Sequence, residues 1–300
     1  MNQKAIEKRS LMVSTFGNGF MGAAGVIVYV VTDLNALLLD AVFSVITFIS
    51  SVMAFYISKN SKRRTASFPN GMYFLEPLYA FIKSVATLML LIIALLESAA
   101  NAYAYFMDHI GHPINSGPVL PYTSLMVLIS FSLAAYNRRQ NEKIGNMSTI
   151  LEAEAKGNFA DGLISAGVGL AFFLLYFIDI KGTLGFLHYT GDFFVTAVLV
   201  AVSIKEPVQT LITSFKEFAY STTQDHYVIE RVHHIFAKHL ADEKENLNIL
   251  IFKQGMNISI KVYVLALEEP EFIDRLLQNK DDVSQDLEKT FEHFSLEYSF

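Results

Sequence analysis

The residues best suited to chemistry lie in an apolar stretch, 150–178, where one face of the predicted helix is polar. At 100° per residue its polar and small positions fall within an arc of about 100°; they are Glu154, Gly157, Asn158, Asp161 and Ser165. A carboxylate inside a membrane costs several kcal/mol unless it is paired or hydrated. This face therefore points toward other helices or water, and Asp161 is a candidate for binding an ion or relaying a proton. The alternative is a packing face of small residues with one satisfied acid.

A second polar stripe lies in the apolar segment 35–57, where Asp40, Ser44 and Thr47 share one helical face. We place Asp40 nearer the outer end of this helix and Thr47 near its middle. Asp40 either joins a site with the first stripe or caps the outer turn of its own helix.

Other polar residues in the apolar segments have structural interpretations. Glu76, Lys83 and Glu97 are seven or fourteen residues apart and share one helical face. We expect Lys83 to extend toward the lipid headgroups. Glu76, just before Pro77, is favoured by the dipole at a helix start. Asn18 is expected to form a hydrogen bond across helices, and all eight histidines are predicted to lie outside the membrane spans.

The composition indicates that these polar groups are carried by membrane-spanning helices. Of the 300 residues, 52% are hydrophobic, and the mean hydropathy is +0.36. Such a chain is typical of a membrane protein. Six apolar segments approach the ~20 residues needed to cross a bilayer; they are 11–31, 35–57, 75–106, 119–136, 150–178 and 190–212. The N-terminal residues lack the cleavage pattern of a signal peptide. The absence of cysteine excludes disulfides, zinc–thiolate sites and thiol catalysis.

The charges of the loops predict the orientation of the chain. Three loops or termini on one side carry ten lysine and arginine residues, grouped at 4–9, 59–64 and 138–143. The opposite loops hold a single cation, Lys181. The positive-inside rule then places both termini in the cytoplasm.

The pattern changes to that of a soluble domain after Phe215. Helical spacing over 226–240 is followed by two strand-like segments around the turn "KQGM", a charged helical stretch after Pro270 and a last strand, "FSLEYSF". We therefore predict an α-helical membrane protein. Residues 1–214 form a domain of six transmembrane helices, and residues 215–300 form a small cytoplasmic α+β domain of ferredoxin-like αββαβ order.

Charge and motifs also exclude several functions. Residues 215–300 carry 9 Lys+Arg against 16 Asp+Glu, which opposes nucleic-acid binding because that needs clustered cations. No Ser-His-Asp arrangement, metal-hydrolase motif or phosphate loop is present. We therefore expect no enzyme activity and no bound cofactor.

Three motifs carry a family resemblance that covers nearly the whole chain. They are "ALLLDAVFSVITF" at 36–48, "SFPNGMYFLEP" at 67–77 and "LEAEAKGNFADGLISAGVGL" at 151–170. Together with six spans, cytoplasmic termini and the αββαβ order, they resemble the cation diffusion facilitator family. The resemblance implies divalent cation efflux coupled to proton antiport, and a dimer.

The resemblance also implies a four-ligand metal site built from two i, i+4 pairs, one on the second helix and one on the fifth. These pairs fall on Phe43 and Thr47, and on Gly157 and Asp161. Only Asp161 keeps a typical ligand side chain. The chain is therefore expected to be a divergent member whose metal site is degenerate.

We predict a transporter whose site consists of Asp161, Asp40, Thr47, Ser44 and Asn158. These oxygen donors suit Mn, Mg or Ca better than Zn. The expected partners are the lipid bilayer, a proton, a divalent cation and a second copy of the chain. The expected location is the bacterial inner membrane. Two alternatives are a transport-deficient partner or regulatory subunit of the same fold, and a membrane-anchored sensor that reads the cytoplasm with its acidic tail.

Overall fold

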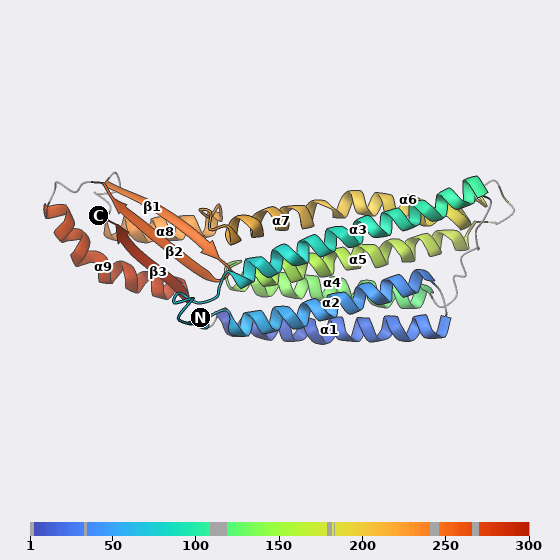
Figure 1. Cartoon of the computed structure of the whole chain (residues 1–300), viewed down its shortest axis with the longest axis horizontal. Coiled ribbons are helices and arrows are strands. Elements are labelled where there is room, and N and C mark those ends of the chain that lie inside the picture. The colour runs from blue at the N-terminus through green and yellow to red at the C-terminus, as the bar shows by residue number, and fades with distance from the viewer. Residues whose placement is uncertain are drawn as a thin grey trace.

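The apolar segments form long helices that lie lengthwise against one another (Figure 1). A computed structural model describes residues 3–32, 35–108, 119–178, 182, 184–240, 246–265 and 270–299. The helices are α1 (Gln3–Thr32), α2 (Asn35–Asn60), α3 (Leu75–Asp108), α4 (Val119–Lys143), α5 (Thr149–Tyr176) and α6 (Leu187–Ser203). The first five predicted segments each coincide with one helix, although α1, α2 and α4 begin or end several residues outside the predicted bounds.

Three stretches of the described residues are long and apolar enough to cross a membrane. They are Gln3–Val30, Leu75–Met107 and Leu187–Phe218. The spans predicted on α2, α4 and α5 stay predictions. The described part of the chain is thus mostly helical, with apolar helices at one end and a small α+β region at the other (Figure 1).

The last predicted span, 190–212, is divided into α6 and α7 (Lys205–Phe218). Ile204 joins them with helical dihedral angles, φ −64° and ψ −26°, and α7 continues toward the sheet (Figure 1). Helix α6 begins three residues earlier than predicted, at a residue without a side-chain cap, so the sequence holds no signal for this boundary. The prediction that every histidine lies outside the spans is therefore wrong for His188, which is buried in the first turn of α6.

The C-terminal region has the predicted αββαβ order. It comprises α8 (His226–His239), β1 (Leu247–Gln254), β2 (Asn257–Val264), α9 (Pro270–Thr290) and β3 (His293–Ser299). The sheet order is β1-β2-β3, with β1 antiparallel and β3 parallel to β2. The turn predicted at "KQGM" is a two-residue hairpin loop, in which Gly255 adopts φ +58°, a conformation that side-chain-bearing residues rarely adopt.

Two buried carboxylates hold the tip of this hairpin against the helical end. Oε2 of Glu76, on α3, accepts a hydrogen bond from the Met256 backbone N–H at 3.1 Å. Oε2 of Glu217, on α7, accepts from the Gly255 N–H at 3.3 Å and from the Thr149 hydroxyl at 2.7 Å. The start of α3 and the end of α7 therefore both bind the loop between β1 and β2.

The hydrophobic core runs without a break from the helical end into the α+β region. Its members come from α1, α2, α3 and α5 as well as from α8, α9 and the sheet. They include Leu11, Ala54, Tyr79, Ile150, Leu151, Val232, Phe236, Ile258, Ile260, Phe272 and Phe291. Burial of this continuous apolar surface fixes the sheet relative to the helices.

His293, the first residue of β3, provides a pH-dependent contribution to stability. Its half-buried ring lies 5.4 Å from that of Tyr73, and burial lowers the pKa of the imidazole below 6.5. The unfolded chain then binds this proton more tightly, so stability falls as the pH drops below about 6.5. The expected loss is below about 1 kcal/mol, because solvent screens a half-exposed group.

We expect His293→Gln to reduce the drop in melting temperature between pH 8 and pH 5, measured on the detergent-solubilised protein. The exposed His234 supplies the control variant, His234→Gln, which should leave that drop unchanged. Equal pH dependence in all three proteins would contradict this assignment.

Candidate functional site

The predicted site residues of α2 and α5 meet in the structure. The Thr47 hydroxyl donates a hydrogen bond to Oδ2 of Asp161 at 3.1 Å. Thr47 is buried and Asp161 is half-buried. The two polar stripes predicted from periodicity therefore face each other, and they bring a carboxylate and a hydroxyl to one point between the helices.

Asn158 lies one turn before Asp161 on the same face of α5. Its side chain is fully buried, and neither Oδ1 nor Nδ2 has a hydrogen-bond partner in the described part of the chain. An unpaired buried amide costs about 1–3 kcal/mol, and such groups are rare in folded proteins. Asn158 therefore offers one carbonyl oxygen and one N–H₂ group to a ligand or to water.

A small cavity lies next to Asp161. Its volume is about 20 Å³, room for about one water molecule. It is lined by the polar residues Ser44, Ser130, Asp161 and Ser165 and by Met21, Met126 and Ile164. Ser44 and Asp161 therefore line the same cavity.

The side chains of Asp40 and Phe43 lie outside the described part of the structure, although both residues belong to α2. The contribution of Asp40 therefore remains a prediction. Among the described side chains of α2, Thr47 and Ser44 lie at the site.

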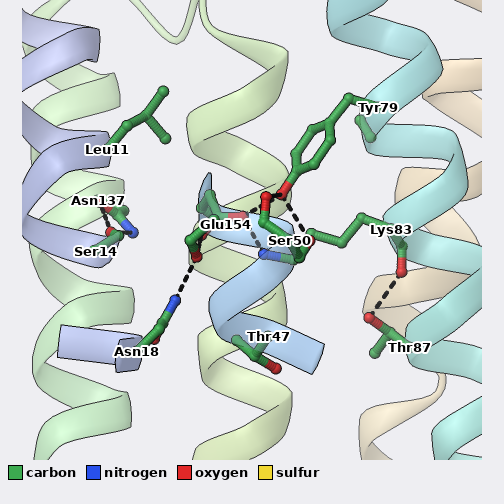
Figure 2. Close-up of polar contacts among 12 residues, drawn as sticks. Leu11, Ser14, Asn18, Thr47, Ser50, Tyr79, Lys83, Thr87, Asn137 and Glu154 are labelled. Atoms are coloured by element: carbon green, nitrogen blue, oxygen red, sulfur yellow. Dashed lines mark hydrogen bonds and ion pairs between the residues drawn. The ribbon is translucent and has the colours of Figure 1, made fainter. Parts of the chain in front are cut away.

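A buried ion pair lies one turn further along the stripe and was not predicted. The Lys83 ammonium group pairs with Oε1 of Glu154, and both side chains are almost completely buried. The Tyr79 hydroxyl donates to the same oxygen at 2.5 Å, and the Ser51 hydroxyl donates to Oε2 at 2.7 Å. Figure 2 shows Tyr79 and Lys83 reaching from α3 toward Glu154 on α5.

The expectation that Lys83 extends to the headgroups is therefore wrong, because the Glu154 carboxylate compensates its charge inside the protein. Of the face shared with Lys83, Glu76 is buried but Glu97 is exposed. Asn18 does form the predicted hydrogen bond across helices, from Nδ2 to the Ser51 hydroxyl at 2.5 Å. This bond extends the polar cluster to α1.

A further cluster of buried charges lies where the helices meet the sheet, at the starts of α1 and α3. Lys4 Nζ lies 2.5 Å from Oε1 of Glu76 and 2.6 Å from Oε1 of Glu7. Glu7 also accepts a hydrogen bond from the Ser58 hydroxyl. These contacts join the starts of α1 and α3 to the end of α2.

The comparison with known families identifies this arrangement. A family model described as the cation efflux transmembrane domain matches residues 11–219. The chain belongs to the cation efflux family. No curated protein matches it. Members of this family are transporters rather than enzymes, so the chain is an integral membrane protein and a cation transporter of the cation diffusion facilitator type. The match covers most of α1 and all of α2 to α7, and it ends before α8.

Family membership makes position 157 informative, since the resemblance implies a metal ligand there. A Cβ atom at Gly157 would lie 2.7 Å from Cε and 3.1 Å from Nζ of Lys83. The lysine therefore occupies the space that a side chain at 157 would need. In this cation efflux protein the Lys83 ammonium group thus lies beside the position where the family resemblance implies a metal ligand.

Among the described residues, no three His, Cys, Asp or Glu side chains are grouped so that they could hold a metal ion. In this part of the chain, oxygen donors of Asp161, Thr47, Ser44 and Asn158 make up the candidate site. This donor set suits a hard cation rather than a thiophilic one.

Proposed function

We propose that the chain exports a divalent cation from the cytoplasm in exchange for protons, and that the cation binds between α2 and α5. The hydrogen bond between Thr47 and Asp161 carries this proposal, because it brings together the two helices that supply the ligands. Asp161 is the principal ligand, and Thr47, Asn158, Ser44 and Asp40 supply further oxygens.

The cation that we propose is Mn²⁺ or Mg²⁺. Both prefer carboxylate, carbonyl and hydroxyl oxygens, whereas zinc prefers nitrogen and sulfur ligands. Proton exchange has its basis in the carboxylate of Asp161, because a ligand must lose its proton before it binds the metal.

For the membrane arrangement we propose six spans formed by α1 to α6, with residues 1–214 as the membrane domain and 215–300 as the cytoplasmic domain. Both chain ends lie toward the α+β end of the molecule (Figure 1), and the cation-rich segments predict that this end is cytoplasmic. We further propose a homodimer in the bacterial inner membrane.

Asp161→Asn tests the transport site. In reconstituted vesicles we expect this variant to lower Mn²⁺ uptake at least about tenfold and to abolish the accompanying pH change. The asparagine amide carries no negative charge to bind the cation, and it neither binds nor releases a proton. Glu97→Gln changes an exposed carboxylate on α3 and serves as the control. Mn²⁺ flux equal to that of the unmodified protein in Asp161→Asn would refute the assignment.

The alternative, a transport-deficient partner subunit, is favoured by one observation: Lys83 fills the space beside Gly157. A subunit of this kind would shape the site of an intact homologue rather than carry cations itself. It would co-purify with that homologue, and the purified chain alone would move no cation. A homodimer that transports Mn²⁺ in vesicles would exclude this function.

A further inference from the structure

The ion pair of Lys83 and Glu154 lies on the same stripe of α5 as the candidate cation site. Glu154, Asn158 and Asp161 follow one another at i, i+4 and i+7, so they share a helical face. The unpaired amide of Asn158 lies between the two carboxylates. The stripe therefore offers carboxylate, carbonyl and carboxylate oxygens in succession, which are the donors that hard divalent cations prefer.

From this placement we propose that Glu154 is a second carboxylate ligand of the transported cation, and that Lys83 is a tethered cation which neutralises Glu154 until the cargo arrives. This inference rests on the proposed transport function. It adds a ligand on α5 and a competitor on α3 to the site.

The surroundings of Glu154 fit the role of a ligand held in readiness. Both carboxylate oxygens are buried, and hydrogen bonds from Tyr79 and Ser51 fix their orientation independently of Lys83. The carboxylate therefore keeps two donors when the ammonium group leaves. A cation that takes the place of the ammonium group preserves the charge balance, so no buried carboxylate is left uncompensated.

The surroundings of Lys83 fit the role of a removable occupant. Its stem is flexible and its charge is compact, unlike the planar guanidinium of arginine. The missing side chain at Gly157 gives the ammonium group its place beside the stripe. A tethered competitor lowers the apparent affinity for the cargo, because the binding-competent state is only part of the population.

Binding of Mn²⁺ to the purified full-length protein tests the proposal, with the melting temperature in detergent as the readout, since a ligand that binds the native state stabilises it. Lys83→Met is expected to bind Mn²⁺ at least about tenfold more tightly than the unmodified protein, since the competitor is gone. Glu154→Gln is expected to bind at least about tenfold more weakly. The double variant should resemble Glu154→Gln, because Lys83 acts only through Glu154.

The matched control is Lys156→Met. Lys156 lies next to Gly157 in the sequence but pairs with Glu152 and Glu206, and it is partly exposed. Its replacement should leave Mn²⁺ affinity unchanged. The proposal is overturned if Lys83→Met binds no more tightly than the unmodified protein, or if Glu154→Gln binds as well as it.

Folding of Lys83→Met is itself informative, because this variant buries an uncompensated carboxylate. A variant that is recovered only when Mn²⁺ is present during purification supports the proposal, and one that Mn²⁺ does not rescue overturns it. If Asp161→Asn abolishes transport while Glu154→Gln keeps full affinity, this inference fails and the transport function stands. If Asp161→Asn transports normally, the proposed transport site fails whatever the affinities at Glu154.

Discussion

Glu76→Ala is expected to lower the free energy of unfolding by about 3 kcal/mol. The substitution removes one partner of the buried Lys4 ammonium group and the acceptor of the buried Met256 N–H. Loss of one member of a buried ion pair typically costs about 3–5 kcal/mol, and Glu7 remains as a second partner of Lys4. Unfolding in mixed micelles, followed by circular dichroism, gives the measurement.

Two variants define what the Glu76 result means. Glu97→Ala removes a glutamate from the same helix at an exposed position and should change stability by less than about 0.5 kcal/mol. Glu76→Gln keeps an oxygen for Met256 but loses the charge, so its effect should be intermediate. Equal stability of Glu76→Ala and Glu97→Ala would show that the hairpin tip is held by other contacts.

Gly255→Val is the second substitution with a large expected effect, also about 3 kcal/mol or more. Gly255 has φ +58°, which a β-branched residue adopts only at a cost of about 1–3 kcal/mol. A Cβ atom there would overlap Oε2 of Glu76, so the carboxylate would also have to move. The melting temperature should fall accordingly.

Gly255→Asn separates the two causes, because asparagine tolerates this backbone conformation but still places a Cβ atom against Glu76. The combination of Gly255→Ala with Glu76→Ala should cost less than the sum of the single variants, because Glu76→Ala removes the carboxylate that the new Cβ atom at position 255 would meet. If the free-energy losses of the two single variants add up in the double variant, positions 255 and 76 are not energetically coupled.

The elements that could be predicted are those with a local signal. The polar stripe of α5 and the turn at Gly255 are periodic or compositional features within a few residues, and both are present in the structure. The hydrogen bond between Thr47 and Asp161 could not be predicted, because each polar stripe is a local feature and says nothing of which helix it faces. The start of α6 could not be predicted, since Phe186 provides no capping side chain.

The partner of Lys83 could not be predicted from the sequence for a different reason. Lys83 and Glu154 are 71 residues apart in the sequence, and the sequence gives each its own local interpretation: Lys83 as a lysine that extends to the headgroups, and Glu154 as one member of a polar stripe. Only the packing of α3 against α5 shows that they neutralise each other. The same packing changes the meaning of Gly157 from a missing ligand to the space that this lysine requires.

The start of α1 depends on residues that the ribosome adds almost three hundred positions later. The backbone N–H of Lys4 donates to Oε2 of Glu292 at 3.0 Å, and the Gln3 side chain accepts from the Glu292 N–H at 3.4 Å. A free N–H group in the first turn of a helix needs such an acceptor. The acceptor of the Lys4 N–H group is therefore synthesised near the end of the chain, just before β3. A chain truncated before position 292 would lack this acceptor, while the contacts of Lys4 with Glu76 and of Glu7 with Ser58 would still join α1 to α3 and α2.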